Sequence, residues 1–168
     1  MTLVVADTAP LRYLVEIGCQ DVLPQLFAKV WIPGAVLREL KQKQTPPAVH
    51  SWADHLPAWI EVREIVADPS ESELAGLDRG EWEAIRLATE LRANLLLMDE
   101  RFGVRVARQQ GFAVTGTLGV LVEAARSGLI VLDDALIRLA KTNFRRTPEL
   151  FAQTKRLVDR TGKRSSGD

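Results

Sequence analysis

Leu3-Val4-Val5-Ala6-Asp7 is the segment of this chain that most restricts its fold. Its short apolar run stops abruptly at an acidic residue, and Leu95-Leu96-Leu97-Met98-Asp99 repeats that arrangement further along. Runs of this kind are typical of buried parallel strands. Because open α/β sheets bind ligands beyond the carboxyl ends of such strands, Asp7 and Asp99 are candidate site residues.

Working outward from these two segments, strands alternate with helices along most of the chain. Strands are expected at about 3–6, 30–32, 60–66, 95–98 and 112–114, the third of them at an edge of the sheet. Helices are expected after Thr8, which could cap the first of them, at 21–27, from Pro33, within 45–59, and at 81–91, 101–110, 117–127, 133–141 and 148–158. This alternation predicts an α/β fold: a central parallel sheet flanked by helices on both faces, with extra C-terminal helices.

The length of 168 residues suits one domain with a substantial core. We expect residues 1–130 to form the α/β domain, 131–160 a helical extension of it, and 161–168 a disordered tail. The single cysteine, Cys19, excludes a disulfide framework and a cysteine-based zinc site. Neither a signal peptide nor a membrane-spanning stretch is evident, which predicts a cytoplasmic protein without membrane association.

Charge is balanced over the whole chain, with 22 basic and 22 acidic residues, but it is unevenly distributed. Acids predominate between Val66 and Glu100, and bases predominate from Asp134 to the end. An acidic centre with a basic C-terminal region suits a metal site beside a surface that could meet phosphates. Two solvated helix faces would account for the same distribution equally well.

Four acids form the candidate site: Asp7, Glu39, Glu81 and Asp99. Each alone has an ordinary explanation, because an acid after a strand can be a turn residue and an acid in a first helical turn suits the helix dipole. Taken as a set at one sheet edge, they would repel one another unless a cation lay between them. Carboxylates without a histidine or cysteine partner favour Mg²⁺ or Mn²⁺ over zinc.

Five ordered blocks of sequence, which span residues 1 to about 130, carry a family resemblance. They are Val4-Val5-Ala6-Asp7-Thr8-Ala9-Pro10-Leu11, Ile32-Pro33-Gly34-Ala35-Val36-Leu37-Arg38-Glu39-Leu40, Leu77-Asp78-Arg79-Gly80-Glu81-Trp82-Glu83-Ala84-Ile85, Leu95-Leu96-Leu97-Met98-Asp99-Glu100 and Val114-Thr115-Gly116-Thr117-Leu118-Gly119-Val120-Leu121. In these blocks the chain resembles the PIN-domain ribonucleases, and most closely a prokaryotic subgroup near the VapC-type toxins of toxin–antitoxin pairs.

The resemblance implies an acidic pocket that holds Mg²⁺ or Mn²⁺, with the same four acids as metal ligands and catalytic residues. It implies that Thr8 is a polar neighbour of the metal site. It also implies that Glu100 could replace or assist Asp99, although its side chain is better placed to start the next helix. Arg101 and Arg105, four residues apart after Asp99, could contact substrate phosphates. An exposed, ion-paired helix face is the alternative for these two arginines.

The resulting functional hypothesis is a metal-dependent endoribonuclease in which metal-activated water attacks an RNA phosphodiester. The resemblance implies the toxin half of a toxin–antitoxin pair, with RNA as substrate, a possible antitoxin partner and a homodimeric assembly. The alternative is a non-catalytic α/β module that uses the same acidic edge to bind an ion, a nucleotide or a protein.

Overall fold

The structure is a computed structural model, and it describes residues 2–66, 70, 76–145 and 148–162. The chain divides into two compact units, Met1–Thr117 and Leu118–Asp168. The first unit contains the whole sheet and all four candidate acids, and the second contains helices. The division therefore falls close to the start of the helix predicted at 117–127.

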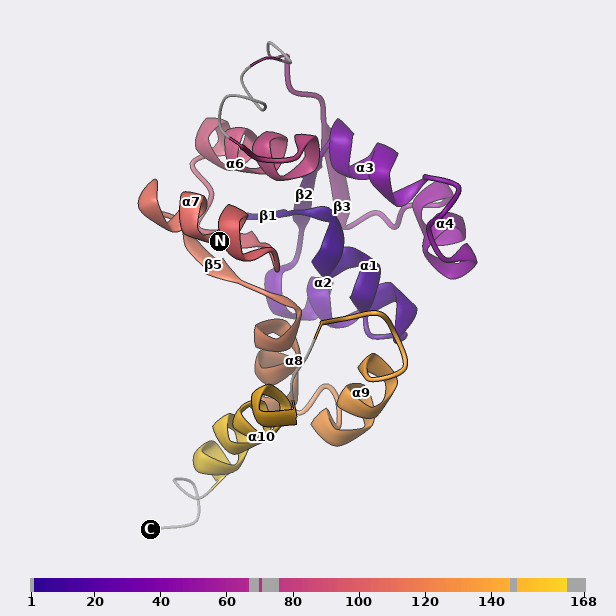
Figure 1. The fold of residues 1–168 in the computed structure, drawn as a ribbon, viewed down its shortest axis with the longest axis vertical. Coiled ribbons are helices and arrows are strands. Elements are labelled where there is room, and N and C mark those ends of the chain that lie inside the picture. The colour runs from indigo at the N-terminus through magenta and orange to yellow at the C-terminus, as the bar shows by residue number, and fades with distance from the viewer. Residues whose placement is uncertain (1, 67–69, 71–75, 146–147, 163–168) are drawn as a thin grey trace. The chain divides into compact units, whose positions relative to one another are not determined.

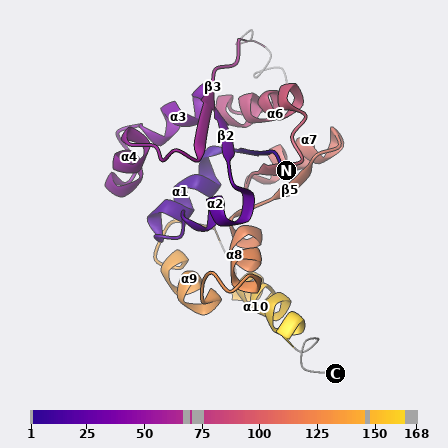
Figure 2. The same ribbon diagram turned by 180° about the vertical axis from the view of Figure 1, so that it is seen from behind.

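Five parallel strands form the sheet of the first unit, in the order β3-β2-β1-β4-β5 (Figure 1). Their bounds are β1 Val4–Ala6, β2 Val30–Pro33, β3 Ile60–Arg63, β4 Leu95–Leu97 and β5 Ala113–Thr115. The predicted α/β fold with a parallel central sheet is confirmed. Figure 2 shows β2 and β3 side by side, and β3 lies at the sheet edge, as its alternating sequence predicted.

Strand burial explains why the sequence runs are so uniformly apolar. All three residues of β1 are buried, because the strand lies in the middle of the sheet and both of its faces are covered. Val5, Leu96 and Val114 lie in register across three strands. They belong to one hydrophobic cluster that also includes residues of α6 and α7.

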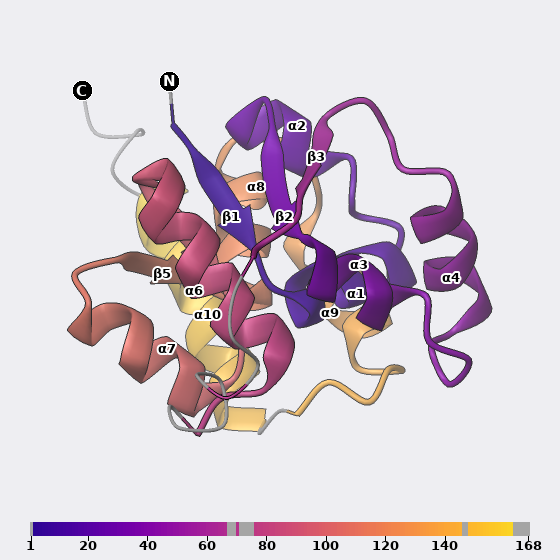
Figure 3. The same ribbon diagram turned by 90° about the horizontal axis from the view of Figure 1, so that it is seen from above.

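The helices of the first unit cover the two faces of this sheet. Their bounds are α1 Thr8–Glu16, α2 Val22–Phe27, α3 Gly34–Leu40, α4 Pro47–Asp54, α6 Arg79–Leu91 and α7 Arg101–Gln109. Figure 3 shows α6 and α7 on one side of the strands, with α1, α3 and α4 on the other. This arrangement follows from right-handed crossovers, because the chain moves across the sheet in opposite directions from β1 to β3 and from β4 to β5.

The start of α1 corrects one expectation from the sequence. Asp7, and not Thr8, occupies the N-cap position, and its side chain makes no capping hydrogen bond. Thr8 is the first residue of the helix, and its hydroxyl donates to the Glu39 carboxylate. Pro33 likewise ends β2 and precedes α3, because its extended backbone (φ −77°, ψ 163°) is not helical.

The second unit contains three helices among its described residues: α8 Thr117–Arg126, which begins at the last residue of the first unit, α9 Leu132–Leu139 and α10 Pro148–Gly162. Within it, Lys155 of α10 pairs with Asp133 of α9 at 3.2 Å. Helix α10 includes residues 161 and 162, which the sequence assigned to the tail, and residues 163–168 lie outside the described residues. Among the described helices, none combines the length and the apolar character that crossing a bilayer requires.

Candidate active site

The two strand-end acids lie where the connections of the sheet change direction. From β1 the chain continues to β2 and β3 on one side, while β4 and β5 pair on the other side of β1. Open α/β sheets bind ligands at such a switch point, beyond the carboxyl ends of the strands. Asp7 directly follows β1, and its backbone N–H donates to Leu97 O at 2.8 Å, two residues before Asp99. The predicted placement of both acids at one sheet edge is confirmed.

Asp7 is the most deeply buried of the four acids, with 5% of its surface exposed. One of its oxygens, Oδ1, is buried without a hydrogen-bond partner among the described residues. Burial raises the pKa of Asp7 to about 8, against the pull of a hydrogen bond from the Thr8 backbone, and repulsion from Asp78, Glu39 and Asp99 adds to the increase. Asp7 occupies the N-cap position of α1 but makes no side-chain capping hydrogen bond, so capping does not explain why this carboxyl group is buried here.

Glu39 reaches this edge from the last turn of α3. The Thr8 hydroxyl donates to its Oε2 at 2.5 Å, and the Gly80 backbone N–H donates to its Oε1 at 3.1 Å. Burial raises the pKa of Glu39 overall, although the hydrogen bond from Thr8 opposes the increase. A Cβ at residue 80 would lie 2.6 Å from Glu39 Oε1, so a larger residue there would displace the Glu39 carboxylate from its present position.

Glu81 lies in the first turn of α6 and is buried, with 6% exposed. Its burial, its side-chain hydrogen bond to Asp78 and repulsion from Asp78, Asp7 and Glu100 raise its pKa to about 8. Asp78 caps α6 by accepting from the Glu81 backbone N–H at 2.8 Å.

Asp78 is a residue of this cluster that the sequence analysis did not select. Its charge raises the pKa of Asp7, Glu39 and Glu81. In the sequence it resembles an ordinary N-cap, and it is one, so its part in the cluster is clear only once the fold brings it close to the other acids. The block Leu77–Ile85 contained the signal, since an acid three residues before Glu81 shares a helical turn with it.

Asp99 is held by Thr117, the first residue of α8. The Thr117 backbone N–H donates to its Oδ1 at 2.7 Å, and the Thr117 hydroxyl donates to its Oδ2 at 2.6 Å. These bonds oppose the increase in the pKa of Asp99 that burial causes. Any Cβ at Gly116 would collide with the Asp99 carboxylate, which explains the glycine there.

Glu100 caps the start of α7. Its Oε2 accepts from the backbone N–H groups of Phe102, at 2.7 Å, and Gly103, at 3.2 Å. Of the two roles open to it, starting the next helix is therefore the one the structure supports.

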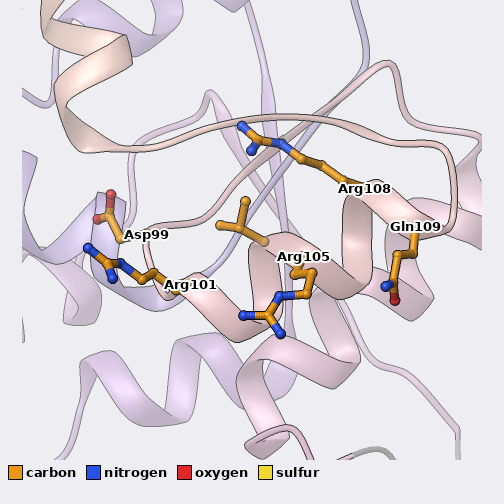
Figure 4. A pocket seen from close by; sticks show the side chains of 6 residues that line it. Asp99, Arg101, Arg105, Arg108 and Gln109 are labelled. Atoms are coloured by element: carbon orange, nitrogen blue, oxygen red, sulfur yellow. The ribbon is translucent and has the colours of Figure 1, made fainter.

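Two pockets flank the acids within the first unit. The larger, of about 550 Å³, is lined by Asp99, Arg101, Val104, Arg105, Arg108 and Gln109 (Figure 4). The smaller, of about 330 Å³, is lined by Thr8, Arg12, Glu39, Leu40, Gln42, Gln44, Thr45 and Asp78. Arg101 and Arg105, which the sequence selected as possible phosphate contacts, thus share one pocket with Asp99.

The chemistry of these side chains is suited to a hard divalent cation. The side chains that could bind the ion are carboxylates, which hard divalent ions prefer. Asp7 Oδ1 is buried, and no hydrogen-bond donor among the described residues contacts it. In the ion-free arrangement no three acids, histidines or cysteines of the described residues converge closely enough to hold an ion. Glu39 and Asp99 instead bind Thr8, Gly80 and Thr117, so their side chains would have to turn toward Asp7.

A parallel sheet with a buried carboxylate cluster at its switch point defines an α/β protein of the type that binds ions or phosphates at that edge. A profile of the family DUF3368, described as a PIN domain, matches residues 3–160. The chain therefore belongs to this PIN-domain family, whose members are generally nucleases that use divalent metals. A comparison with curated proteins found no match.

Proposed function

We propose that this protein is a Mg²⁺- or Mn²⁺-dependent endoribonuclease that hydrolyses RNA phosphodiester bonds at the acidic cluster. The observation that carries the proposal is the Asp7 carboxylate, buried at the switch point with one oxygen unpartnered and with other acids around it. A buried carboxyl oxygen without a hydrogen-bond partner is costly, so such groups persist where function needs them. The family makes cleavage of nucleic acid the appropriate chemistry for that site.

In the proposed mechanism Asp7, Glu39, Glu81 and Asp99 would hold the ion. A bound divalent ion supplies an activated water and neutralises charge on the phosphoryl oxygens. Glu39 and Asp99 would turn from the hydroxyls of Thr8 and Thr117, to which they are bonded in the structure, toward Asp7. One of the four acids takes the proton of the attacking water. Single-stranded or looped RNA is the expected substrate because its backbone is accessible.

The experiment is cleavage of a labelled single-stranded RNA by purified protein, with Mg²⁺ or Mn²⁺ and with a chelator. Asp7→Asn and Asp99→Asn should each reduce the rate by at least 100-fold, and chelation should stop the reaction. Asp21→Asn is the matched control, because Asp21 is exposed and precedes α2 at the opposite edge of the sheet. Equal activity in both site variants would identify a contaminating nuclease and contradict the proposal.

We further propose that the protein acts as the toxin of a toxin–antitoxin pair, on the strength of its resemblance to VapC-type toxins. Expression in a bacterial host should then arrest growth, and the Asp7→Asn variant should not. An antitoxin encoded beside it should restore growth. Normal growth with wild-type protein that cuts RNA in the test tube would reject the toxin role but leave the nuclease proposal intact.

The non-catalytic module is the competing hypothesis, and the same samples distinguish it. If the ion binds, as shown by a shift in thermal unfolding, and no RNA is cut, the acidic edge binds ligands without catalysis.

A further inference from the structure

Three arginines form one exposed face of α7: Arg101, Arg105 and Arg108. Their spacing of four and three residues places them on the same side of the helix. Figure 4 shows their side chains around one pocket, with Asp99 at one end and Gln109 at the other. The three residues span about 10 Å of helix axis, at roughly 1.5 Å per residue.

The stability of α7 does not explain this arginine face. Like charges three or four residues apart destabilise a helix by about 0.2–0.5 kcal/mol per pair. Arg101 is also the first residue of α7, where the positive end of the helix dipole disfavours a cation. Only Arg108, in the last turn, has a position that the dipole favours.

Ion pairing within the protein does not explain the arginine face either. In the described part of the chain, none of the three guanidinium groups lies within 4.0 Å of a carboxylate, and none makes a hydrogen bond. Among the described residues, therefore, nothing supports the alternative of an ion-paired helix face for Arg101 and Arg105. Three arginines that repel one another, and that have no acidic partner in the described part of the chain, are suited to an anionic ligand.

We propose that Arg101, Arg105 and Arg108 bind backbone phosphates of single-stranded nucleic acid on the side of the acidic cluster where Asp99 lies. This inference rests on the proposed nuclease function, since it takes the strand that is cut at the acids as the ligand. Each guanidinium presents paired N–H donors that match phosphate oxygens. Phosphate contacts of this kind fix the position of a strand but carry no sequence information. The arginine face is therefore a positioning surface that is indifferent to sequence.

The test is binding of a fluorescently labelled single-stranded RNA oligonucleotide, measured by anisotropy in chelator so that no cleavage occurs. The triple variant Arg101→Gln, Arg105→Gln, Arg108→Gln should bind roughly tenfold more weakly or worse at low salt. The slope of log affinity against log salt should fall in magnitude by about 2, at roughly 0.7 for each phosphate contact of a single strand. If the triple variant does not fold, each single variant should lower the slope by about 0.7.

Arg92→Gln is the matched control. Arg92 is an exposed arginine of the same unit, and it precedes β4 whereas Asp99 follows that strand, so it lies at the opposite sheet edge. Its left-handed backbone (φ 54°) strains arginine and glutamine alike. Affinity of the triple variant within twofold of wild type, or an equal loss in Arg92→Gln, would overturn the inference.

Cleavage assays on the same proteins separate this inference from the proposed function. Wild-type protein that binds RNA through the arginine face but never cuts it would reject the nuclease proposal and leave the binding surface in place. Wild-type protein that cuts RNA, together with unchanged binding by the triple variant, would reject the arginine face alone.

Discussion

Asp7 is the residue on which the electrostatics of the acidic cluster depend most. Its carboxylate is buried, it lacks a partner at Oδ1, and it interacts with three further acids. The sequence predicted its place at the end of a strand, because an apolar run stops there. It could not show that the carboxylate leaves the helix uncapped, since that depends on where the side chain lies in the folded protein.

The first prediction concerns pH in the ion-free protein. An acid whose pKa is higher in the folded than in the unfolded state binds more protons when folded, so stability falls as pH rises between the two values. Asp7 and Glu81 have ordinary values of 3.8 and 4.5, and both rise to about 8 in the folded protein. The free energy of unfolding in chelator should therefore decrease steadily from about pH 5 to pH 8.

Urea unfolding at several pH values measures this decrease. Asp7→Asn should make it shallower, since the variant cannot ionise at that position, and should be at least as stable as wild type at pH 8. Asp21→Asn, a change on an exposed side chain, is the control. Stability that rises with pH across this range would show that the cluster is not protonated in the folded state.

At the scale of elements, Glu83 joins α3 to α6 beneath the site. Its side chain is fully buried and accepts from Arg79 Nε at 2.5 Å and from the Ala35 backbone N–H at 3.4 Å, while Arg38 lies 3.8 Å away. The same two helices carry Glu39 and Glu81, and Gly80 binds Glu39 directly. Glu83 thus fixes the spacing of helices that must bring two acids together.

The second prediction follows from this contact. Glu83→Ala should lower the free energy of unfolding by about 1–3 kcal/mol, because it leaves the Ala35 N–H buried without a partner and removes the bonds of Arg79. Glu83→Gln, which keeps one acceptor, should cost less. Chemical denaturation measures both, with exposed Glu90→Gln on the same helix as the control. A loss no larger than that of the control would show that Glu83 does not join the helices.

The sequence predicted the position of an acid correctly where that position depends on the end of a strand. No such local rule predicts positions that depend on how helices pack in the folded protein. Strand ends placed Asp7 and Asp99 correctly, since neighbouring parallel strands share an edge. The approach of Glu39 and Glu81 to that edge depends on how α3 and α6 pack, so the sequence suggested it only from the four acids taken as a set and from the family resemblance. Glu83 was not predicted at all, because a charged residue within a helical pattern is normally solvated.

At the scale of the whole molecule, a homodimer remains a prediction. In the second unit Val131 and Ile137 are 64% and 59% exposed, and Ile137 points away from the residues of α9 that are buried. Identical apolar patches commonly meet across a twofold axis. Light scattering should give about twice the chain mass of 18.7 kDa. Ile137→Arg should shift the protein toward the monomer, whereas a monomeric wild type at all concentrations would contradict the dimer.

The last prediction concerns the response of the whole fold to the ion. A ligand that binds only the folded state stabilises it by an amount that grows with ligand concentration, reaching about 2.7 kcal/mol at 100 times Kd. Since Asp7 and Glu81 have pKa values near 8 in the ion-free protein, binding must displace protons from them. The increase in Tm caused by Mg²⁺ or Mn²⁺ should therefore be larger at pH 8 than at pH 6.

Thermal unfolding with millimolar Mg²⁺ or Mn²⁺, against the same buffer with chelator, measures this increase. Asp7→Asn should lose most of it, because the change removes the negative charge at the buried centre of the cluster, and Asp21→Asn should retain it in full. Arg101, Arg105 and Arg108 are not among the proposed ion ligands. The variant that replaces all three with glutamine should therefore also keep the ion-dependent increase in Tm. An unchanged Tm in wild type at both pH values would argue that these carboxylates hold no divalent ion.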